Sequence, residues 1–239
     1  MMDYFFVDPS DVQETTLQLR GDEVRHLVRV LRKKVGERIM VMDGRGRMFH
    51  SIIRSIGRDS VSCEIADVRE EVNEPKIHVT LAVSMLKNPA RFDLLVEKAT
   101  ELGVRTIIPL ECERTIRHEY KHLRLQRIAL AAAKQSGRCY VPEIFVRTSF
   151  ATLVDAADGF DVRLIPHEQT EQSQFIGTVM RHHKDAGRVL VAVGPEGGFA
   201  DHEFGLASSH GFIPISLGPR RLRTETAAFT AVSYVVGGW

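Results

Sequence analysis

The chain has 239 residues, of which 44% are hydrophobic and 26% charged, with only 18 Gly and 9 Pro. This composition excludes disordered and fibrous proteins and allows one large domain or two small ones. No apolar run reaches the roughly 18 residues that a membrane-spanning helix needs, and the first ten residues lack a signal-peptide pattern. We therefore expect a cytoplasmic protein with no membrane partner. Its three cysteines are widely spaced and lack a C-x-x-C pair, which favours reduced packing residues and predicts no metal site.

Charge is unevenly distributed along the chain, although the net charge is only +1. Between Arg20 and Arg58, eleven basic residues stand against four acidic ones, so this segment carries a local charge of +7. Lysine and arginine side chains that displace counterions from phosphates supply most non-specific affinity for nucleic acid. The segment therefore indicates a polyanionic partner. A solvated, ion-paired surface is the alternative interpretation.

The region between residues 20 and 70 predicts a small β-rich domain. Apolar residues at positions 24, 27, 28 and 31 indicate one helical face. Short β-rich runs separated by turn residues then predict strands at 38–42, 48–53 and 61–68, with a hairpin loop at 43–46. Their spacing fits a small β-barrel. The polar, acidic stretch 70–75 ends in a proline and is typical of a linker.

Strands and helices alternate beyond residue 75. The pattern predicts strands at 77–83, 106–110, 162–165, 188–193 and 212–216. It predicts helices at 91–102, 123–135, 172–182, 201–209 and 224–236. This alternation favours an α/β fold with a mostly parallel sheet, and ligands bind such sheets beyond the carboxyl ends of the strands. Candidate site residues should therefore directly follow the strands.

Of two loops that follow predicted strands, only the second has a composition that indicates a ligand site. The first, Pro166-His167-Glu168, does not by itself indicate a function. The loop from Gly194 to Phe199 contains three glycines and leads into a helix. Such glycines let backbone N–H groups approach a ligand, and a helix N-terminus favours negative charge. Its glycine spacing matches neither common phosphate-binding motif, and a tight strand-to-helix turn is the alternative interpretation.

A third loop follows the last predicted strand and is rich in arginine. Gly218-Pro219 is followed by Arg220, Arg221 and Arg223. A guanidinium presents several donors in one plane and keeps its charge, so this cluster suits recognition of an anion or a nucleobase. The next helix carries Ala227, Ala228 and Ala231. These small residues indicate close packing by another helix or by a flat ligand.

One motif points to a different class of enzyme. Residues 118–122 read His-Glu-Tyr-Lys-His and match H-E-x-x-H, the zinc-protease signature. The surrounding residues Arg114, Arg117, Arg124 and Arg127 weigh against it, because a zinc-protease helix is partly buried and this stretch is strongly basic. Zinc metalloprotease is therefore kept as an alternative hypothesis. An RNA-binding module without catalytic activity is another.

The two most distinctive loops resemble motifs of a known family. GPEGG at 194–198 and L-G-x-x-x-L-R-x-E-T-A at 217–227 closely resemble the RsmE family of SPOUT-class RNA methyltransferases. Further segments resemble that family in the same order: Arg29 to Arg32 with Asp43-Gly44, Glu97 to Val104, Glu113-Arg114, and Gln135 to Arg138 through Pro142. These motifs extend over most of the chain, and their fixed order makes the resemblance specific.

The resemblance implies a fold and an activity. It implies a PUA-like, RNA-binding β-barrel at residues 1–72, joined to a SPOUT-type α/β methyltransferase domain at 73–239 with a deep C-terminal trefoil knot. Members of the family act as homodimers. They use S-adenosyl-L-methionine to methylate N3 of one uridine in the 16S RNA of the small ribosomal subunit.

The resemblance also implies site residues. The loops at Pro166, 194–198 and 217–227 would form the knot and hold the cofactor in a bent shape. Backbone groups of Leu217, Gly218 and Leu222 would hold the adenine, and Gly198 would let the methionine end come close. The residues expected to contact the cofactor are Ile165, Pro166, Gly194, Glu196, Gly197, Gly198, Leu217, Gly218, Leu222, Arg223, Thr226 and Ala227. Those expected to bind RNA are Arg25, Arg29, Arg32, Lys33, Arg114, Arg138 and Arg221.

Methylation at N3 of uridine sets chemical requirements. N3 is a poor nucleophile while it carries its proton, so a group must remove the proton or stabilise the imide anion. Arg223 and Arg221 are suited to stabilise the anion, and Glu196 and Glu225 are candidates for the base. Alternatively, the two carboxylates only accept hydrogen bonds from loop amides. Because N3 lies on the pairing edge, the base must be unpaired or pulled out of its stack.

Overall fold

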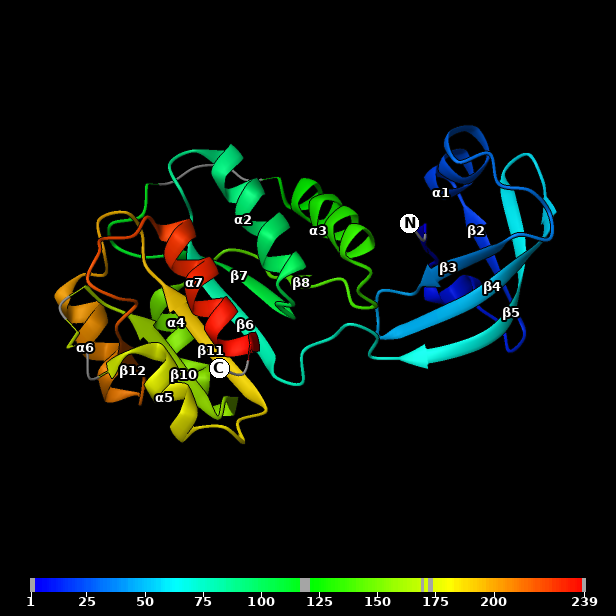
Figure 1. Cartoon of the computed structure of the whole chain (residues 1–239). Coiled ribbons are helices and arrows are strands. Elements are labelled where there is room, and N and C mark those ends of the chain that lie inside the picture. Colours follow the sequence, from blue (N-terminus) through cyan, green and yellow to red (C-terminus); the bar gives the residue numbers. More distant parts are fainter. Residues whose placement is uncertain (1–2, 117–120, 169, 172–173, 238–239) are drawn as a thin grey trace. The chain divides into compact units, whose positions relative to one another are not determined.

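Figure 1 shows a computed structural model of the chain, in which residues 3–116, 121–168, 170–171 and 174–237 are described. The chain forms two compact units. The first contains the residues up to Glu74 together with Leu130–Val141, and the second contains Pro75–Ala129 and the residues from Pro142 onward. This division lies close to the expected boundary at residue 72. The segment Leu130–Val141, which we expected in the second domain, packs in the first, where Ala133 and Cys139 join a buried cluster with methionines of the β-rich unit.

The first unit is built on one five-stranded sheet in the order β1-β3-β4-β5-β2. Its strands are β1 (Tyr4–Phe6), β2 (Thr16–Arg20), β3 (Arg38–Met42), β4 (Arg47–Ile56) and β5 (Ser60–Glu70). The strands predicted at 38–42, 48–53 and 61–68 are confirmed, whereas β1 and β2 were not predicted. In the residues that the structure describes, β1 and β2 are the two ends of the sheet, which leaves the expected barrel open between them.

Short helical segments and a tight turn complete the first unit. A 3₁₀ turn, Pro9–Asp11, precedes β2, and α1 (Asp22–Arg25) runs directly into a π-helical turn, His26–Val30. Val24 and Leu27 of this helical segment are buried in the core, as their spacing predicts, whereas Leu31 is partly buried and Val28 of the same expected face is exposed. The turn between β3 and β4 is held by Asp43, whose carboxylate accepts hydrogen bonds from the backbone N–H groups of Arg45 and Arg47.

The second unit is built on a parallel sheet in the order β12-β10-β11-β6-β7-β8, with β9 paired to β7. Its strands are β6 (His78–Ser84), β7 (Thr106–Glu111), β8 (Glu143–Ile144), β9 (Thr148–Ser149), β10 (Val162–Pro166), β11 (Arg188–Val193) and β12 (Ile213–Ile215). Within the described residues, every pairing among these strands is parallel. The five strands predicted here and the parallel sheet are therefore confirmed.

Helices cover both faces of this sheet, as Figure 1 shows. They are α2 (Pro89–Glu101), α4 (Phe150–Asp155), α5 (Ile176–His182), α6 (Asp201–Ser209) and α7 (Thr224–Gly237). Helix α3 (His122–Ser136) begins in this unit, and its residues from Leu130 onward belong to the first unit. Helix α7 packs against α2, α5, β6 and β11, while α4 and α6 pack against each other. Phe150, Leu153 and Phe212 form a core with Ala82 and Leu190 of the central strands.

The sequence pattern predicts most of these helices well. In α2, Phe92, Leu95, Val96 and Ala99 are buried, and the Asn88 side chain accepts a hydrogen bond from the Ala90 backbone at the helix start. The helix expected from residue 172 begins at Ile176, and α4 was not predicted. Within the described ranges, no helix combines the length and apolar character needed to cross a membrane.

Candidate active site

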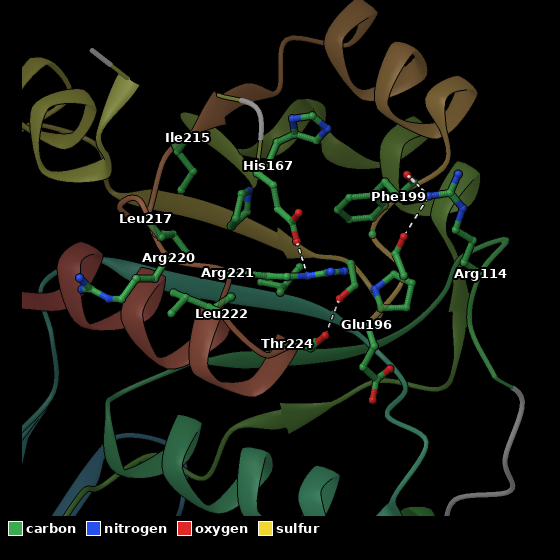
Figure 2. A pocket seen from close by; sticks show the side chains of 18 of the residues that line it. Arg114, His167, Glu196, Phe199, Ile215, Leu217, Arg220, Arg221, Leu222 and Thr224 are labelled. Carbon is green, nitrogen blue, oxygen red and sulfur yellow. Dashed lines mark hydrogen bonds and ion pairs between the residues drawn. The ribbon is translucent and has the colours of Figure 1, made fainter. Parts of the chain in front are cut away.

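A cavity of about 290 Å³ lies at the carboxyl ends of β10, β11 and β12 (Figure 2). The three loops singled out in the sequence supply its walls, and Arg114 joins them from the segment after β7. The lining residues are Arg114, Pro166, His167, Glu168, Val193, Gly194, Pro195, Glu196, Gly197, Gly198, Phe199, Asp201, Ile215, Leu217, Gly218, Arg220, Arg221, Leu222, Thr224 and Ala227. The parallel topology therefore brings together loops that are far apart in the sequence, as the rule for α/β sheets predicts.

Glycines shape the walls of this cavity. Gly198 has φ +71° and Gly218 has φ +106°, a left-handed conformation that other residues adopt only with strain. No atom lies within 4 Å of the place where a Cβ would stand on either residue. At Gly194, a Cβ would lie 3.0 Å from the Phe199 ring. The glycines thus expose backbone at the cavity and allow the aromatic ring to pack directly on the loop.

The loop from Gly194 to Phe199 is held by neighbouring side chains. The Thr224 hydroxyl at the start of α7 donates a hydrogen bond to the Gly194 carbonyl at 3.1 Å. The Phe199 ring packs against Phe150 of α4, with 4.8 Å between ring centroids. Arg114 donates hydrogen bonds to the carbonyls of Gly197 and Phe199 at 2.9 and 3.3 Å. The loop is therefore tied to three other parts of the second unit.

Positive charge gathers at the mouth of the cavity. Arg221 forms an ion pair with Glu168 at 3.0 Å, which joins two of the lining loops (Figure 2). Both side chains are exposed, so this pair contributes little stability. Arg220 and Arg223 are also exposed, and neither has an ion-pair partner among the described residues. These guanidinium groups are therefore available to an anionic ligand.

A second charged cluster lies beside the glycine loop. Arg91 of α2 donates hydrogen bonds to both carboxylate oxygens of Glu225, at 2.5 to 2.9 Å. Its guanidinium also lies 3.7 Å from the carboxylate of Glu196. The hydrogen bond to Glu225 raises the pKa of Arg91 above its ordinary value. Glu225 is 8% exposed and fully engaged, whereas Glu196 is more exposed and lines the cavity.

Nine of the twelve residues expected at the cofactor line this cavity. Ile165, Arg223 and Thr226 do not. Ile165 is completely buried and packs in the core of the sheet. Arg223 and Thr226 are exposed at the beginning of α7, next to lining residues. Of the three residues considered for catalysis, only Glu196 lines the cavity, while Glu225 shares the Arg91 guanidinium with it and Arg223 directly precedes α7.

The residues expected to bind RNA fall into different environments. In the first unit, Arg25, Arg29 and Arg32 are exposed. Lys33 is partly buried and pairs with Asp3 and Glu37, at 3.1 and 3.6 Å. In the second unit, Arg221 lies at the mouth of the cavity and Arg114 contacts the glycine loop. Only some of these basic side chains are free to meet phosphate.

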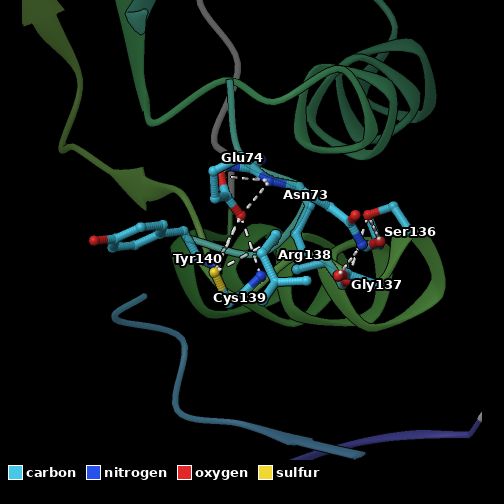
Figure 3. Close-up of polar contacts among 10 residues, drawn as sticks. Asn73, Glu74, Ser136, Gly137, Arg138, Cys139 and Tyr140 are labelled. Atoms are coloured by element: carbon cyan, nitrogen blue, oxygen red, sulfur yellow. Dashed lines mark hydrogen bonds and ion pairs between the residues drawn. The ribbon is translucent and has the colours of Figure 1, made fainter. Parts of the chain in front are cut away.

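Arg138 is a clear correction to this set (Figure 3). It is 1% exposed, and its guanidinium forms an ion pair with Glu74 at 2.7 Å. The same carboxylate accepts hydrogen bonds from the backbone N–H groups of Cys139 and Tyr140, both at 3.1 Å. A guanidinium enclosed in this way cannot contact an RNA phosphate. Arg138 therefore stabilises the first unit instead of binding RNA.

The zinc-protease motif lies mostly outside the described residues. His118, Glu119 and Tyr120 are not described, and neither are Arg117 and the C-terminal Trp239. The last histidine of the motif, His122, begins α3. Among the residues that are described, no group of three or more His, Cys, Asp or Glu side chains is arranged to hold a metal ion.

Sequence reasoning missed two charged side chains beside the site. Arg91, which pairs with Glu225, was assigned only to a helix. Glu203, whose carboxylate accepts hydrogen bonds from the backbone N–H groups of Glu113 and Ala200, was not considered. Both are charged residues in the first turn of a helix that begins near the carboxyl edge of the sheet. That position is the signal that could have identified them, because helix starts at this edge face the ligand side.

Comparisons with known proteins define the class of the chain. Residues 73–236 match the family described as RNA methyltransferase domain, and residues 19–66 match the RNA methyltransferase PUA domain. The chain is 31% identical to ribosomal RNA small subunit methyltransferase E of Synechocystis sp., over 96% of this chain and 75% of that protein. For the Bacillus subtilis protein of the same name the identity is 32%, over 92% and 90%. The fold and site are thus those of an RNA methyltransferase.

Solved structures agree with this class. The crystal structure of ribosomal RNA small subunit methyltransferase E from Neisseria gonorrhoeae, bound to S-adenosyl methionine, matches with a TM-score of 0.88 and 31% identity. The match covers 100% of this chain and 98% of that chain. A methyltransferase from Legionella pneumophila, in complex with the bound cofactor, matches with a TM-score of 0.81 and 31% identity, over 98% and 97%. The chain belongs to the ribosomal RNA small subunit methyltransferase E family.

Proposed function

We propose that the protein transfers the methyl group of S-adenosyl-L-methionine to N3 of a uridine in 16S RNA of the small ribosomal subunit. The observation that carries this proposal is the cavity, in which nine residues expected from the family resemblance come together. The solved relatives that carry the cofactor support the same assignment.

The residues that line the cavity fit this cofactor. Val193, Ile215 and Leu222 supply apolar surface for an adenine ring, and the backbone at Gly218 and Gly198 is open to a ligand. The volume of about 290 Å³ is close to the lower end of the range for small-molecule sites, which suits a compact, bent ligand. When bound, the cofactor supplies a methyl group on a positively charged sulfur, which an in-line nucleophile can accept.

Glu196 and Arg223 are the residues that we assign to proton and charge handling. Glu196 lines the cavity and keeps an exposed carboxylate, so it can accept the N3 proton. Arg223 is exposed beside the lining residues and is suited to stabilise the negative charge that spreads onto the uracil oxygens. Glu225 has both carboxylate oxygens occupied by Arg91 and is assigned to position the start of α7.

RNA binding is assigned to both units. Arg25, Arg29 and Arg32 are exposed in the first unit and suited to phosphate contacts, while Arg221 lies where the target base enters the cavity. The base must leave its stack to present N3, so the protein must also bind the flanking RNA. We also propose that the loops around the cavity form a deep trefoil knot and that the protein acts as a homodimer, both from the family resemblance.

The experiment that tests this function uses methyl-labelled cofactor. The protein is incubated with labelled S-adenosyl-L-methionine and with small ribosomal subunits that lack the modification, and the labelled nucleoside is identified after digestion. We expect label in 3-methyluridine and its loss in Arg223→Ala. Arg147→Ala serves as the matched control, because this exposed arginine pairs with Glu111 and does not line the cavity.

Other outcomes would change the assignment. Label in another nucleoside would keep the enzyme class and overturn the N3 assignment. Absence of label from a folded protein that binds RNA would favour the non-catalytic RNA-binding module. Hydrolysis of a peptide with bound zinc would favour the metalloprotease hypothesis.

A further inference from the structure

The glycine loop of the cavity is contacted by residues that follow β7. Arg114 Nη1 donates to the carbonyl oxygens of Gly197 and Phe199, at 2.9 and 3.3 Å. A Cβ placed on Gly197 would lie 3.5 Å from the aliphatic part of the Arg114 side chain. One arginine therefore both packs against the loop and satisfies two of its carbonyl groups. Figure 2 shows these contacts at the edge of the cavity.

Glu203 joins the same two segments by a second route. It lies in the first turn of α6 and is only 5% exposed. One carboxylate oxygen accepts a hydrogen bond from the Glu113 backbone N–H at 2.9 Å. The other accepts from the Ala200 backbone N–H, also at 2.9 Å. A buried carboxylate that links two backbone segments holds them firmly, because each N–H would otherwise lose its partner.

The two links hold the end of the loop that contains its two adjacent glycines. Arg114 holds the carbonyl groups of Gly197 and Phe199, on either side of Gly198, and Glu203 holds the N–H of Ala200. Glycine has more backbone freedom than any other residue, so this part of the loop depends most on such contacts. Without support, such a loop populates several conformations, and only one of them fits the ligand. The apparent affinity of a ligand falls in proportion to the population of the competent conformation.

We propose that Arg114 and Glu203 are positioning residues that hold the glycine loop in its ligand-binding shape, so that Arg114 controls affinity for the cofactor. This role differs from the RNA contact that the resemblance implies for Arg114. It rests on the proposed function, because the ligand of the cavity is taken to be S-adenosyl-L-methionine. The resulting signature is a change in cofactor affinity with little change in the rate at saturating cofactor.

The test measures cofactor binding by calorimetry in the absence of RNA. Arg114→Met keeps the packing on Gly197 and removes the donors, so we expect about tenfold weaker binding. Arg114→Lys keeps the charge and a donor nitrogen but loses the fixed geometry of the guanidinium, and we expect a loss of about threefold. Arg124→Met is the matched control: it removes an exposed arginine that pairs with Asp93, and we expect cofactor affinity to stay within about twofold.

Kinetics and stability separate positioning from other roles. At saturating cofactor, Arg114→Met should keep the methyl-transfer rate within about twofold while the KM for the cofactor rises about tenfold. Its thermal midpoint should match the wild type, because Arg114 is exposed. Glu203→Gln keeps the shape of the side chain but replaces one carboxylate oxygen with an NH₂ group, so one of the two backbone N–H groups loses its acceptor. The cofactor affinity of this variant should fall at least as far as that of Arg114→Met.

Three results would overturn the proposal in distinguishable ways. Wild-type protein that binds no cofactor would refute the proposed function itself. Wild-type binding with unchanged affinity in Arg114→Met would refute only the positioning role. Weaker RNA binding in Arg114→Met, with unchanged cofactor affinity, would restore Arg114 to the RNA-binding set.

Discussion

Arg91 and Glu225, which are 134 positions apart in the sequence, form a bidentate ion pair between the starts of α2 and α7. The Glu225 side chain is 11% exposed and that of Arg91 is 28% exposed, so the pair is largely shielded from water. The same guanidinium lies 3.7 Å from Glu196 in the cavity wall. One arginine therefore connects the helix that follows Arg223 with the loop that carries the proposed base.

Replacing Arg91 with Met is expected to slow methyl transfer more than it weakens cofactor binding. The change leaves Glu225 without its cation and loosens the start of α7, where Arg223 is located. Arg91 does not line the cavity, so cofactor affinity should stay within about twofold while the single-turnover rate falls about tenfold. The free energy of unfolding should fall by about 1–2 kcal/mol.

The double variant Arg91→Met with Glu225→Gln provides the control. Removing both charges avoids an unpaired carboxylate, so stability should recover relative to Arg91→Met alone. The methyl-transfer rate should remain low, because the link between α2 and α7 is still weakened. Full activity in Arg91→Met would contradict the positioning role of the ion pair.

The glycines that expose backbone at the cavity allow a second prediction. Gly198→Ala forces a Cβ onto a residue with φ +71°, where no other part of the protein lies within 4 Å. The strain costs about 1–2 kcal/mol, and the new methyl group occupies ligand space, so cofactor binding should fall at least tenfold. Gly205→Ala is the control, since Gly205 lies in α6 without a positive φ and with no atom near its Cβ position. It should be neutral or slightly stabilising. Equal cofactor affinity in the two variants, measured by calorimetry, would show that Gly198 does not face the ligand.

Elements with strong local periodicity were predictable from the sequence. The buried face of α2 follows from the spacing of Phe92, Leu95 and Val96, and the buried run of β11 follows from its continuous apolar residues. β1 was missed because it has only three residues and is defined by parallel pairing with β3, far along the chain. The assignment of Leu130–Val141 to the first unit likewise depends on tertiary packing that local sequence does not encode.

The candidate site was predictable in position but not in its charge pairing. Loops after strands meet at one edge of a parallel sheet, which explains why the residues around Gly194 and Leu217 line one cavity. The partners of Arg91 and Arg138 lie 134 and 64 positions away, so the sequence alone cannot separate a paired arginine from a free one. The expected RNA-binding set therefore included Arg138, whose burial and ion pair only the fold reveals.

The three cysteines give a prediction that depends on pH. Burial raises the pKa of Cys63, Cys112 and Cys139 to about 12, with a smaller contribution from Glu203 at Cys112 and Glu74 at Cys139. Because the thiolate is the reactive form, none of the three should react with iodoacetamide at pH 8 in the folded protein. All three should react after denaturation, as followed by mass spectrometry. Rapid labelling of the native protein would contradict this environment.

The raised thiol pKa also sets the direction of a stability change. The unfolded chain ionises its thiols near their ordinary pKa of 9.0, whereas the folded chain keeps them protonated until about 12. Their contribution to stability is therefore complete below pH 9 and is lost as the pH rises between these values. In urea denaturation above pH 9, the free energy of unfolding of Cys63→Ala should fall less steeply with pH than that of the wild type, by up to about 1.4 kcal/mol per pH unit. An identical pH dependence in the variant and the wild type would show that the Cys63 thiol does not contribute.

The buried pair of Arg138 and Glu74 distinguishes a structural arginine from an RNA-binding one. Arg138→Met leaves an enclosed carboxylate without its cation, so the free energy of unfolding should fall by about 3–5 kcal/mol in urea denaturation. Arg69→Met is the control in the same unit, because that exposed arginine pairs with exposed Asp67 and should change stability by less than about 1 kcal/mol. Under conditions in which Arg138→Met remains folded, its affinity for RNA should match the wild type, since the Arg138 side chain is only 2% exposed. A stable variant with weakened RNA binding would mean instead that Arg138 reaches the phosphate backbone.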